Sequence, residues 1–145
     1  MAIDKSSRWW RGESATDLAE YLQLAEPGGY RVDRVLTAVC ADCAGATFKL
    51  RAGRAKGGVE RTCANCAKKV LMLDTGDYWD DMGPTLIKCP CGGDLFEVSV
   101  GFSLRVDDEI RWVTVGQRCV NDGILGYCAD WKIDYGPTRH LLSSV

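Results

Sequence analysis

The spacing of eight cysteines constrains this chain of 145 residues more than any other feature of its sequence. Two C-x-x-C pairs begin at Cys40 and Cys63, and a tighter C-x-C pair begins at Cys89. An even number of cysteines would also suit a disulfide scaffold, but that reading requires an export signal and an oxidising compartment. The N-terminal residues contain no apolar stretch of the signal-peptide kind. The sequence therefore favours metal ligands over disulfides and predicts a cytoplasmic protein.

The first metal site is complete in the sequence. Its four cysteines follow the pattern C-x2-C-x19-C-x2-C, and two thiolates three residues apart can hold one tetrahedral ion from a tight turn. Small residues after the first pair, Ala44 and Gly45, let backbone amides approach the sulfur atoms. The predicted ligands of this first structural zinc ion are Cys40, Cys43, Cys63 and Cys66.

An internal repeat relates this segment to a later one. The stretch CADCAGATFKL, from Cys40, aligns with CPCGGDLFEV, from Cys89, after one deletion. The stretch RTCANCAKKVLMLD then aligns with QRCVNDGILGYCAD, so that Cys63 meets Cys119 and Cys66 meets Asp122. A repeat of this length fixes the architecture of the whole chain.

The second metal site lacks its fourth cysteine. Cys89, Cys91 and Cys119 supply three thiolates, and the alignment makes Asp122 the fourth ligand of a second Zn²⁺ ion. A carboxylate oxygen is an accepted zinc ligand. Cys128 is the alternative fourth ligand, since a chain reversal at one of the intervening glycines could bring it back to the metal.

Each repeat has a cysteine pair, a strand, a returning strand and a second knuckle. This arrangement resembles the zinc-ribbon fold over about residues 35–75 and again over 85–132. The C-terminal half, with CPCGG, RWVTVGQRC and DWKIDYGP, is similar to small bacterial zinc-ribbon proteins of no assigned activity, so the resemblance implies a fold alone. We expect an N-terminal arm and helix over residues 1–34, a first ribbon over 35–84 and a second ribbon with a tail over 85–145, packed as one unit.

The elements around the knuckles can also be predicted. Residues 14–26 have an apolar stripe and a capping box of Ser14 and Asp17, which indicates a helix that ends at Pro27. Residues 96–102 and 110–115 alternate like antiparallel strands, with a turn over 107–109. The predicted fold class is mainly β with an N-terminal helix and two zinc-ribbon units.

Composition and charge limit the class of partner. The chain is 46% hydrophobic and 26% charged, as in globular proteins, and no apolar run approaches the roughly 20 residues that a membrane span needs. Residues 40–70 carry a charge of +5, so the hairpin 49–61 could contact phosphates through Arg51, Arg54 and Lys56. The chain as a whole has a net charge of −2, and this hairpin tip has no aromatic residue for base stacking.

Enzymatic motifs are lacking. The single histidine, His140, belongs to no H-x-E or H-E-x-x-H motif and is expected at the surface. Aromatic residues stand among acidic ones at 77–81 and 130–135, and two tryptophans are adjacent at Trp9 and Trp10. These aromatic side chains could either cover a small core or form a surface that binds a partner. The sequence therefore predicts a non-enzymatic zinc-binding adaptor for a protein partner. The alternatives are a nucleic-acid-binding ribbon and, third, a zinc enzyme at the second site.

Overall fold

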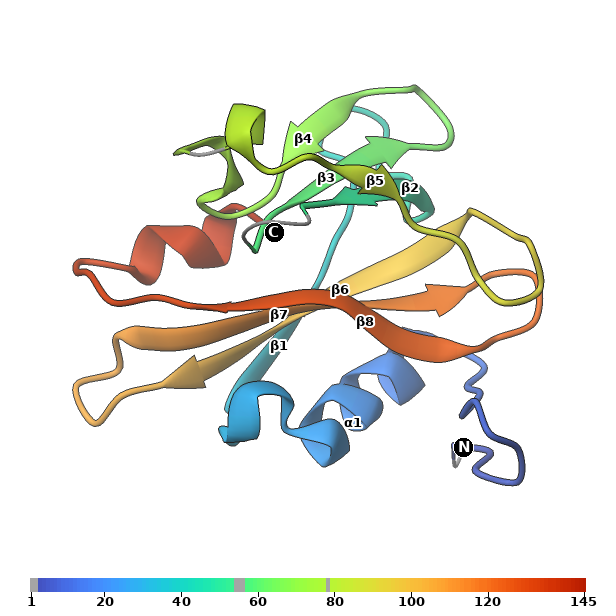
Figure 1. The fold of residues 1–145 in the computed structure, drawn as a ribbon, viewed down its shortest axis with the longest axis horizontal. Coiled ribbons are helices and arrows are strands. Elements are labelled where there is room, and N and C mark those ends of the chain that lie inside the picture. The colour runs from blue at the N-terminus through green and yellow to red at the C-terminus, as the bar shows by residue number, and fades with distance from the viewer. Residues whose placement is uncertain (1–2, 54–56, 78) are drawn as a thin grey trace.

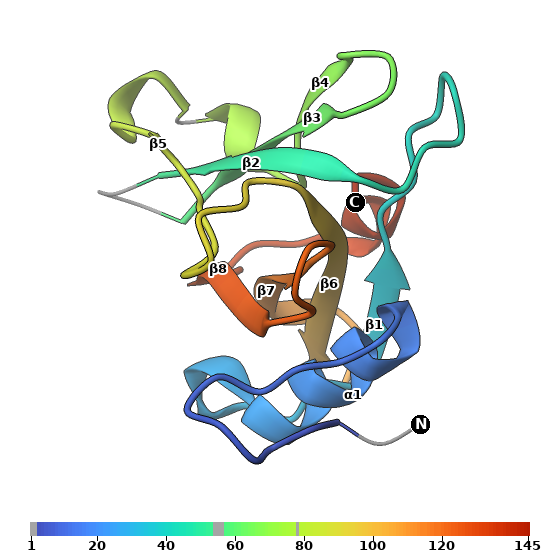
Figure 2. The same cartoon turned by 90° about the vertical axis from the view of Figure 1, so that its right-hand side faces the viewer.

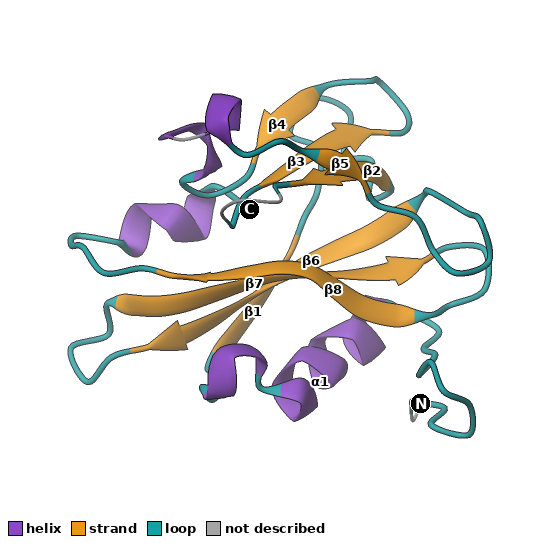
Figure 3. Ribbon diagram, viewed as in Figure 1, coloured by secondary structure: helices purple, strands orange, loops and turns teal. Residues whose placement is uncertain are grey.

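The computed structural model describes residues 3–53, 57–77 and 79–145. Within these residues the fold is a mainly antiparallel β-sheet with one N-terminal α-helix, which confirms the predicted class (Figures 1 and 3). The helix is α1 (Ala15–Ala25), and the strands are β1 (Arg34–Thr37), β2 (Phe48–Ala52), β3 (Val59–Cys63), β4 (Lys69–Leu71), β5 (Thr85–Leu86), β6 (Phe96–Leu104), β7 (Ile110–Cys119) and β8 (Leu125–Lys132). Short 3-10 turns are η1 (Pro27–Gly29), η2 (Thr75–Asp77), η3 (Trp79–Asp81) and η4 (Arg139–Ser143).

The sheet bends into two layers. Its strand order is β4-β3-β2-β6-β7-β8, and β2 and β6 are joined by a single antiparallel pair, Phe48 with Phe96. Strands β2 to β5 form one layer, and β1, β6, β7 and β8 form the other (Figure 1). Cys40 and Cys43 precede β2, and Cys89 and Cys91 precede β6. The bend between β2 and β6 therefore brings the two halves of the chain together.

The short strand before each cysteine pair crosses to the other half. β1 pairs with β6, where Thr37 lies opposite Ser99, and β5 pairs with β2, where Leu86 lies opposite Arg51. Thr37 and Leu86 each stand three residues before the first cysteine of their pair. The two crossings therefore have the same register and tie each half to the other.

The core lies between the two layers. Phe48, Leu50 and Val59 of one layer and Val100 and Phe102 of the other are fully buried in a single cluster. Full burial of such a side chain stabilises a fold by about 1.5–3 kcal/mol. The even-numbered side chains of β6 face this core. The alternation predicted for residues 96–102 thus extends over the whole strand.

Helix α1 covers the opposite face of the second layer (Figure 2). Its apolar stripe buries Leu18 and Leu22 completely. Leu22 lies directly over Gly116 of β7, where a Cβ atom would come 2.8 Å from Leu22 Cδ2. The absence of a side chain at residue 116 therefore lets the helix approach the sheet. No described helix combines the length and apolar character that a bilayer-spanning segment requires.

The predicted capping box does not form. Ser14 is the N-cap residue of α1, but its side chain makes no capping hydrogen bond. Asp17 is buried, and its carboxylate accepts a hydrogen bond of 2.7 Å from the amide of Glu13, one residue before the N-cap. The preceding residue is fastened elsewhere, since the amide of Gly12 donates to the carbonyl of Gly123 at 2.9 Å. This path of the chain brings the amide of Glu13 to the Asp17 carboxylate, so no capping bond forms with Ser14.

Candidate metal centres

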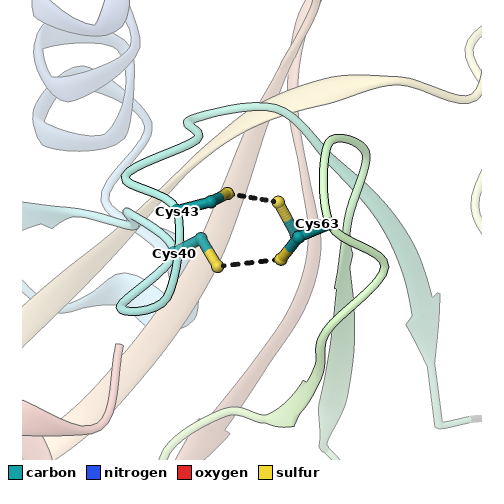
Figure 4. Close-up of side chains that lie close together, drawn as sticks. Cys40, Cys43 and Cys63 are labelled. Atoms are coloured by element: carbon teal, nitrogen blue, oxygen red, sulfur yellow. Dashed lines mark hydrogen bonds between the residues drawn. The ribbon is translucent and has the colours of Figure 1, made fainter.

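The first cluster joins the turn after β1 to the turn after β3. Cys40 Sγ lies 3.5 Å from Cys66 Sγ, and Cys43 Sγ lies 3.5 Å from Cys63 Sγ. Figure 4 shows Cys40 and Cys43 on one turn facing Cys63 on the other. All four sulfur atoms lie within 4.8 Å of one another, so this group could hold a metal ion.

The second cluster joins the turn after β5 to the turn after β7. Cys91 Sγ lies 3.7 Å from Cys119 Sγ, and both carboxylate oxygens of Asp122 lie 3.5 Å from Cys89 Sγ. The four ligand atoms again lie within 4.8 Å of one another and could hold a second metal ion. Asp122 thus occupies the place that Cys66 has in the first cluster.

The turns that carry the cysteine pairs make matching backbone hydrogen bonds. The amide of Cys40 donates to the carbonyl of Gly45, and the amide of Cys89 donates to that of Gly93, both at 2.8 Å. A Cβ atom on Gly45 would lie 3.2 Å from the sulfur atoms of Cys43 and Cys63, closer than ordinary van der Waals contact. Glycine at this position therefore leaves space for the sulfur atoms.

The second knuckles match in the same way. The amide of Cys63 donates to the carbonyl of Lys68 at 2.9 Å, and the amide of Cys119 donates to that of Ile124 at 3.0 Å. Both knuckles also turn through a residue with positive φ, Ala67 in the first and Gly123 in the second. Two segments with different side chains therefore adopt the same turn around their ligand atoms.

Cys128, the alternative fourth ligand, lies apart from the second cluster. It stands in β8 where the register with β7 shifts, and its Sγ is 3.8 Å from the carbonyl oxygen of Val115. It packs against the central core, and burial raises the pKa of its thiol to about 12. Of the two candidates, the structure brings Asp122 to the three cysteines.

The turns themselves influence the thiols. Backbone amides of Cys43 and Asp42 donate toward Cys40 and lower its pKa, and the amide of Cys66 does the same for Cys63. Amides that point at sulfur stabilise the thiolate, which is the form that binds metal. The backbone therefore prepares Cys40 and Cys63 for negative charge. The amide of Lys68 also lowers the pKa of Cys66, but hydrogen bonds with the neighbouring thiols and burial raise it overall to about 12.

In the second cluster, burial is the largest influence on the pKa of two thiols. Burial raises the pKa of Cys89 to about 12 and also raises that of Cys119, whereas the side chain of Asn121 lowers the pKa of Cys91. Burial also acts to raise the pKa of Asp122, but hydrogen bonds from the Ile124 amide and the neighbouring thiols lower it overall. The carboxylate thus remains charged beside three thiols.

A buried arginine lies beside the first cluster. Arg61 stands two residues before Cys63 on the same face of β3, and its guanidinium is 4.8 Å from the centre of the Phe48 ring. Its Nη2 donates to the carbonyl of Val145 at 2.9 Å, but Nε and Nη1 have no hydrogen-bond partner among the described residues. Sequence reasoning counted Arg61 only as part of the basic segment. Its i, i+2 spacing to Cys63 is the sequence signal that both side chains lie on the same face of the strand.

The other residues that the sequence singled out lie in different surroundings. Trp131 packs against the core and donates from its indole nitrogen to Asp74 at 3.0 Å, and the hydroxyl of Tyr135 donates to the same carboxylate at 2.9 Å. In the stretch 77–81, Tyr78 lies outside the described residues, and Trp79 is partly buried. His140 is exposed in η4 and belongs to neither cluster.

No protein-family model matches this sequence, and no curated protein or solved structure matches it either.

Proposed function

We propose that this chain is a non-enzymatic zinc protein in which two structural zinc ions hold the fold, and whose surface engages a protein partner. The observation that carries the proposal is the presence of two groups of four side chains, each with all ligand atoms within 4.8 Å of one another. Each group draws two ligands from one turn and two from another, so a bound ion would link segments that are distant in sequence.

The separations of the ligand atoms fit zinc. A tetrahedral ion with Zn–S distances of about 2.3 Å holds its sulfur atoms about 3.8 Å apart, and the pairs measured here are 3.5–3.7 Å apart. A disulfide would require about 2.05 Å. For one thiolate and one carboxylate oxygen the tetrahedral separation is about 3.6 Å, against the 3.5 Å between Cys89 and Asp122. Thiolate ligands in tetrahedral arrangement favour zinc among divalent ions.

A structural role is supported by the completeness of both ligand sets. Catalytic zinc sites keep three protein ligands and an open position for water, whereas structural sites have four protein ligands. Each cluster offers four. The two knuckles of each half lie at the ends of antiparallel strands, as in a zinc ribbon, and we interpret the matched turns as two such units arising from an internal repeat.

A nucleic-acid partner is the alternative, and the contacts of the basic segment disfavour it. Lys68 pairs with Asp42 at 3.0 Å and Arg51 with Glu60 at 3.5 Å, while Arg61 is buried. Lys49 also pairs with Asp94 at 3.9 Å, so three of the seven cations of residues 40–70 are paired with carboxylates and a fourth is buried. Arg54 and Lys56, on which the prediction of phosphate contacts also rests, lie outside the described residues.

Salt dependence separates the two kinds of partner. A complex held by phosphate contacts weakens steeply as salt rises, and Arg51→Ala would flatten that slope. We expect no specific binding of DNA or RNA at physiological salt, measured by fluorescence anisotropy. A sub-micromolar complex whose salt slope falls in Arg51→Ala would replace the protein-partner proposal with the nucleic-acid one.

Elemental analysis tests the zinc proposal directly. We expect two zinc ions per chain, and we expect a strong chelator to remove them with loss of the native circular dichroism spectrum, since metal binding and folding of small units are coupled. A chain that folds with no zinc, or that keeps its thermal midpoint within a few degrees after chelation, would refute it.

A further inference from the structure

The N-terminal arm, residues 3–12, is fastened to the second knuckle. Arg11 forms isolated antiparallel bridges with Asp4 and with Ile124. The amide of Leu125 donates to the carbonyl of Trp10 at 2.8 Å. The arm thus folds back on itself and adds to the start of β8. This contact holds the two adjacent tryptophans of the arm next to the second metal cluster.

Two adjoining hollows, of about 350 Å³ each, lie between this arm, α1 and β8. They share Trp9, Tyr21, Leu125 and Tyr127, and together we call them the arm groove. Trp10 packs edge-on against Tyr21 with ring centroids 6.1 Å apart, which anchors the arm. By contrast, Trp9 is 44% exposed and Tyr127 is 43% exposed. Trp10 therefore anchors the arm to α1, whereas Trp9 faces solvent.

The charged side chains of the arm groove are both cationic. Lys88 lines one hollow and Arg8 lines the other, and no described carboxylate lines either. Neither residue forms an ion pair within the part of the chain that the structure describes. The Arg8 guanidinium lies 5.0 Å from the Trp9 ring centre, which keeps positive charge at the aromatic wall. In a chain of net charge −2, this local excess favours an anionic occupant.

The arm groove also lies at a sheet edge and against the second metal cluster. β8 is the last strand in the sheet order, and the arm covers its edge at Leu125. Extended peptides commonly bind along an edge such as the one that continues beyond Leu125. Cys89 and Pro90 line one hollow beside Phe96 and Ile124, so the turn that carries the metal ligands forms part of its wall. These apolar walls offer space to aliphatic or aromatic side chains.

We infer that the arm groove binds an extended acidic peptide of a partner protein, one that places apolar side chains between the aromatic walls and carboxylates against Arg8 and Lys88. The inference rests on the proposed function, because it specifies the protein partner of the zinc-held fold. Exposed aromatic residues beside cations also suit single-stranded nucleic acid. The peptide is favoured because the described groove has two cations and several apolar walls, rather than a row of phosphate contacts.

Selection from a library of random ten-residue peptides, displayed on phage, tests this inference on the zinc-loaded full chain. We expect enrichment of peptides that combine Asp or Glu with aromatic residues or Leu. A synthetic peptide from the enriched set should bind at least about tenfold more weakly to Trp9→Ala and to Lys88→Glu, measured by fluorescence anisotropy. Val106→Ala, which removes an exposed apolar side chain at the distant turn after β6, is the matched control and should bind as the parent chain does.

Three results would overturn the inference. They are enrichment of basic peptides, no enrichment above that on a Trp9→Ala bait, or a ten-nucleotide single-stranded DNA that displaces the selected peptide at physiological salt and depends equally on Trp9. Zinc content is measured on every bait. If the chain holds two zinc ions and selects no acidic peptide, the docking inference fails alone; if it is folded without zinc, the proposed function fails.

Discussion

Asp122 is the residue that distinguishes the two clusters. It has the position in the turn after β7 that Cys66 has in the turn after β3, but it presents a carboxylate in place of a thiolate. Oxygen ligands bind zinc less covalently than thiolates do, so the second ion should exchange faster than the first. We predict that Asp122→Cys slows release of this ion to a chelator, so that two release phases become one slow phase without a change of fold.

Cys128 provides the control at the residue scale. Its sulfur contacts the carbonyl of Val115 and not the second cluster. Cys128→Ser should therefore leave zinc content at two ions and the release rates unchanged. If Cys128→Ser removes one zinc and Asp122→Ala removes none, the fourth position belongs to Cys128 instead.

Arg61 is predicted to stabilise the first zinc ion through charge. Four thiolates around Zn²⁺ carry a net charge of −2, and the buried guanidinium has two nitrogens that no described residue satisfies. Removing a group that supports metal ligands from outside the coordination sphere commonly weakens metal binding 10–100-fold. Arg61→Gln should thus lower the zinc affinity of the first site by at least about tenfold, as measured by competition with a chromogenic chelator.

The same loss of charge at an exposed position is the matched control for Arg61. The side chain of Arg31 is 85% exposed, and Arg31→Gln should leave the affinity of both sites unchanged. Equal weakening in the two variants would mean that overall charge, and not the buried guanidinium, sets the affinity.

At the scale of elements, the start of α1 depends on a different residue from the one that the sequence indicates. Asp17 is buried and accepts the Glu13 amide, whereas the hydroxyl of Ser14 caps nothing. We expect Asp17→Ala to destabilise the fold by about 1–3 kcal/mol, because it removes a partly buried hydrogen bond to a carboxylate. Ser14→Ala should cost less than about 0.5 kcal/mol. Urea unfolding of both variants measures the two losses of stability. A larger loss in Ser14→Ala than in Asp17→Ala would support the capping box instead.

The elements that the sequence predicts are those with a local signal. The spacing of the cysteines predicted which side chains gather in two groups, and alternation predicted the hairpin of β6 and β7. The crossings of β1 and β5 were not predicted, because strands of four and two residues are too short to show a period. Their pairing is also non-local, as is the contact of the arm with Ile124. Such contacts depend on how the whole sheet bends, and a local sequence pattern does not predict that bend.

At the scale of the whole molecule, the two halves are joined where the metal ligands lie. Phe48 pairs with Cys63 across β2 and β3, Phe96 pairs with Cys119 across β6 and β7, and the two phenylalanines pair with each other. The exchange of β1 and β5 adds two further connections between the layers. The segments 35–84 and 85–145 remain a predicted division of the chain, but neither contains all the strands that its own sheet layer uses.

This connectivity predicts that the fold is lost as one unit. Cys63→Ser removes a ligand of the first cluster only, yet it frees the strand that faces Phe48 at the junction of the layers. Since each half borrows a strand from the other, loss of the first ion should also expose the second half to solvent. We therefore expect the parent chain to unfold in a single calorimetric transition. In Cys63→Ser we expect amide hydrogens of β7 to exchange as fast as those of β3. Protected β7 amides in that variant, or two separate transitions in the parent chain, would instead show two units that fold independently.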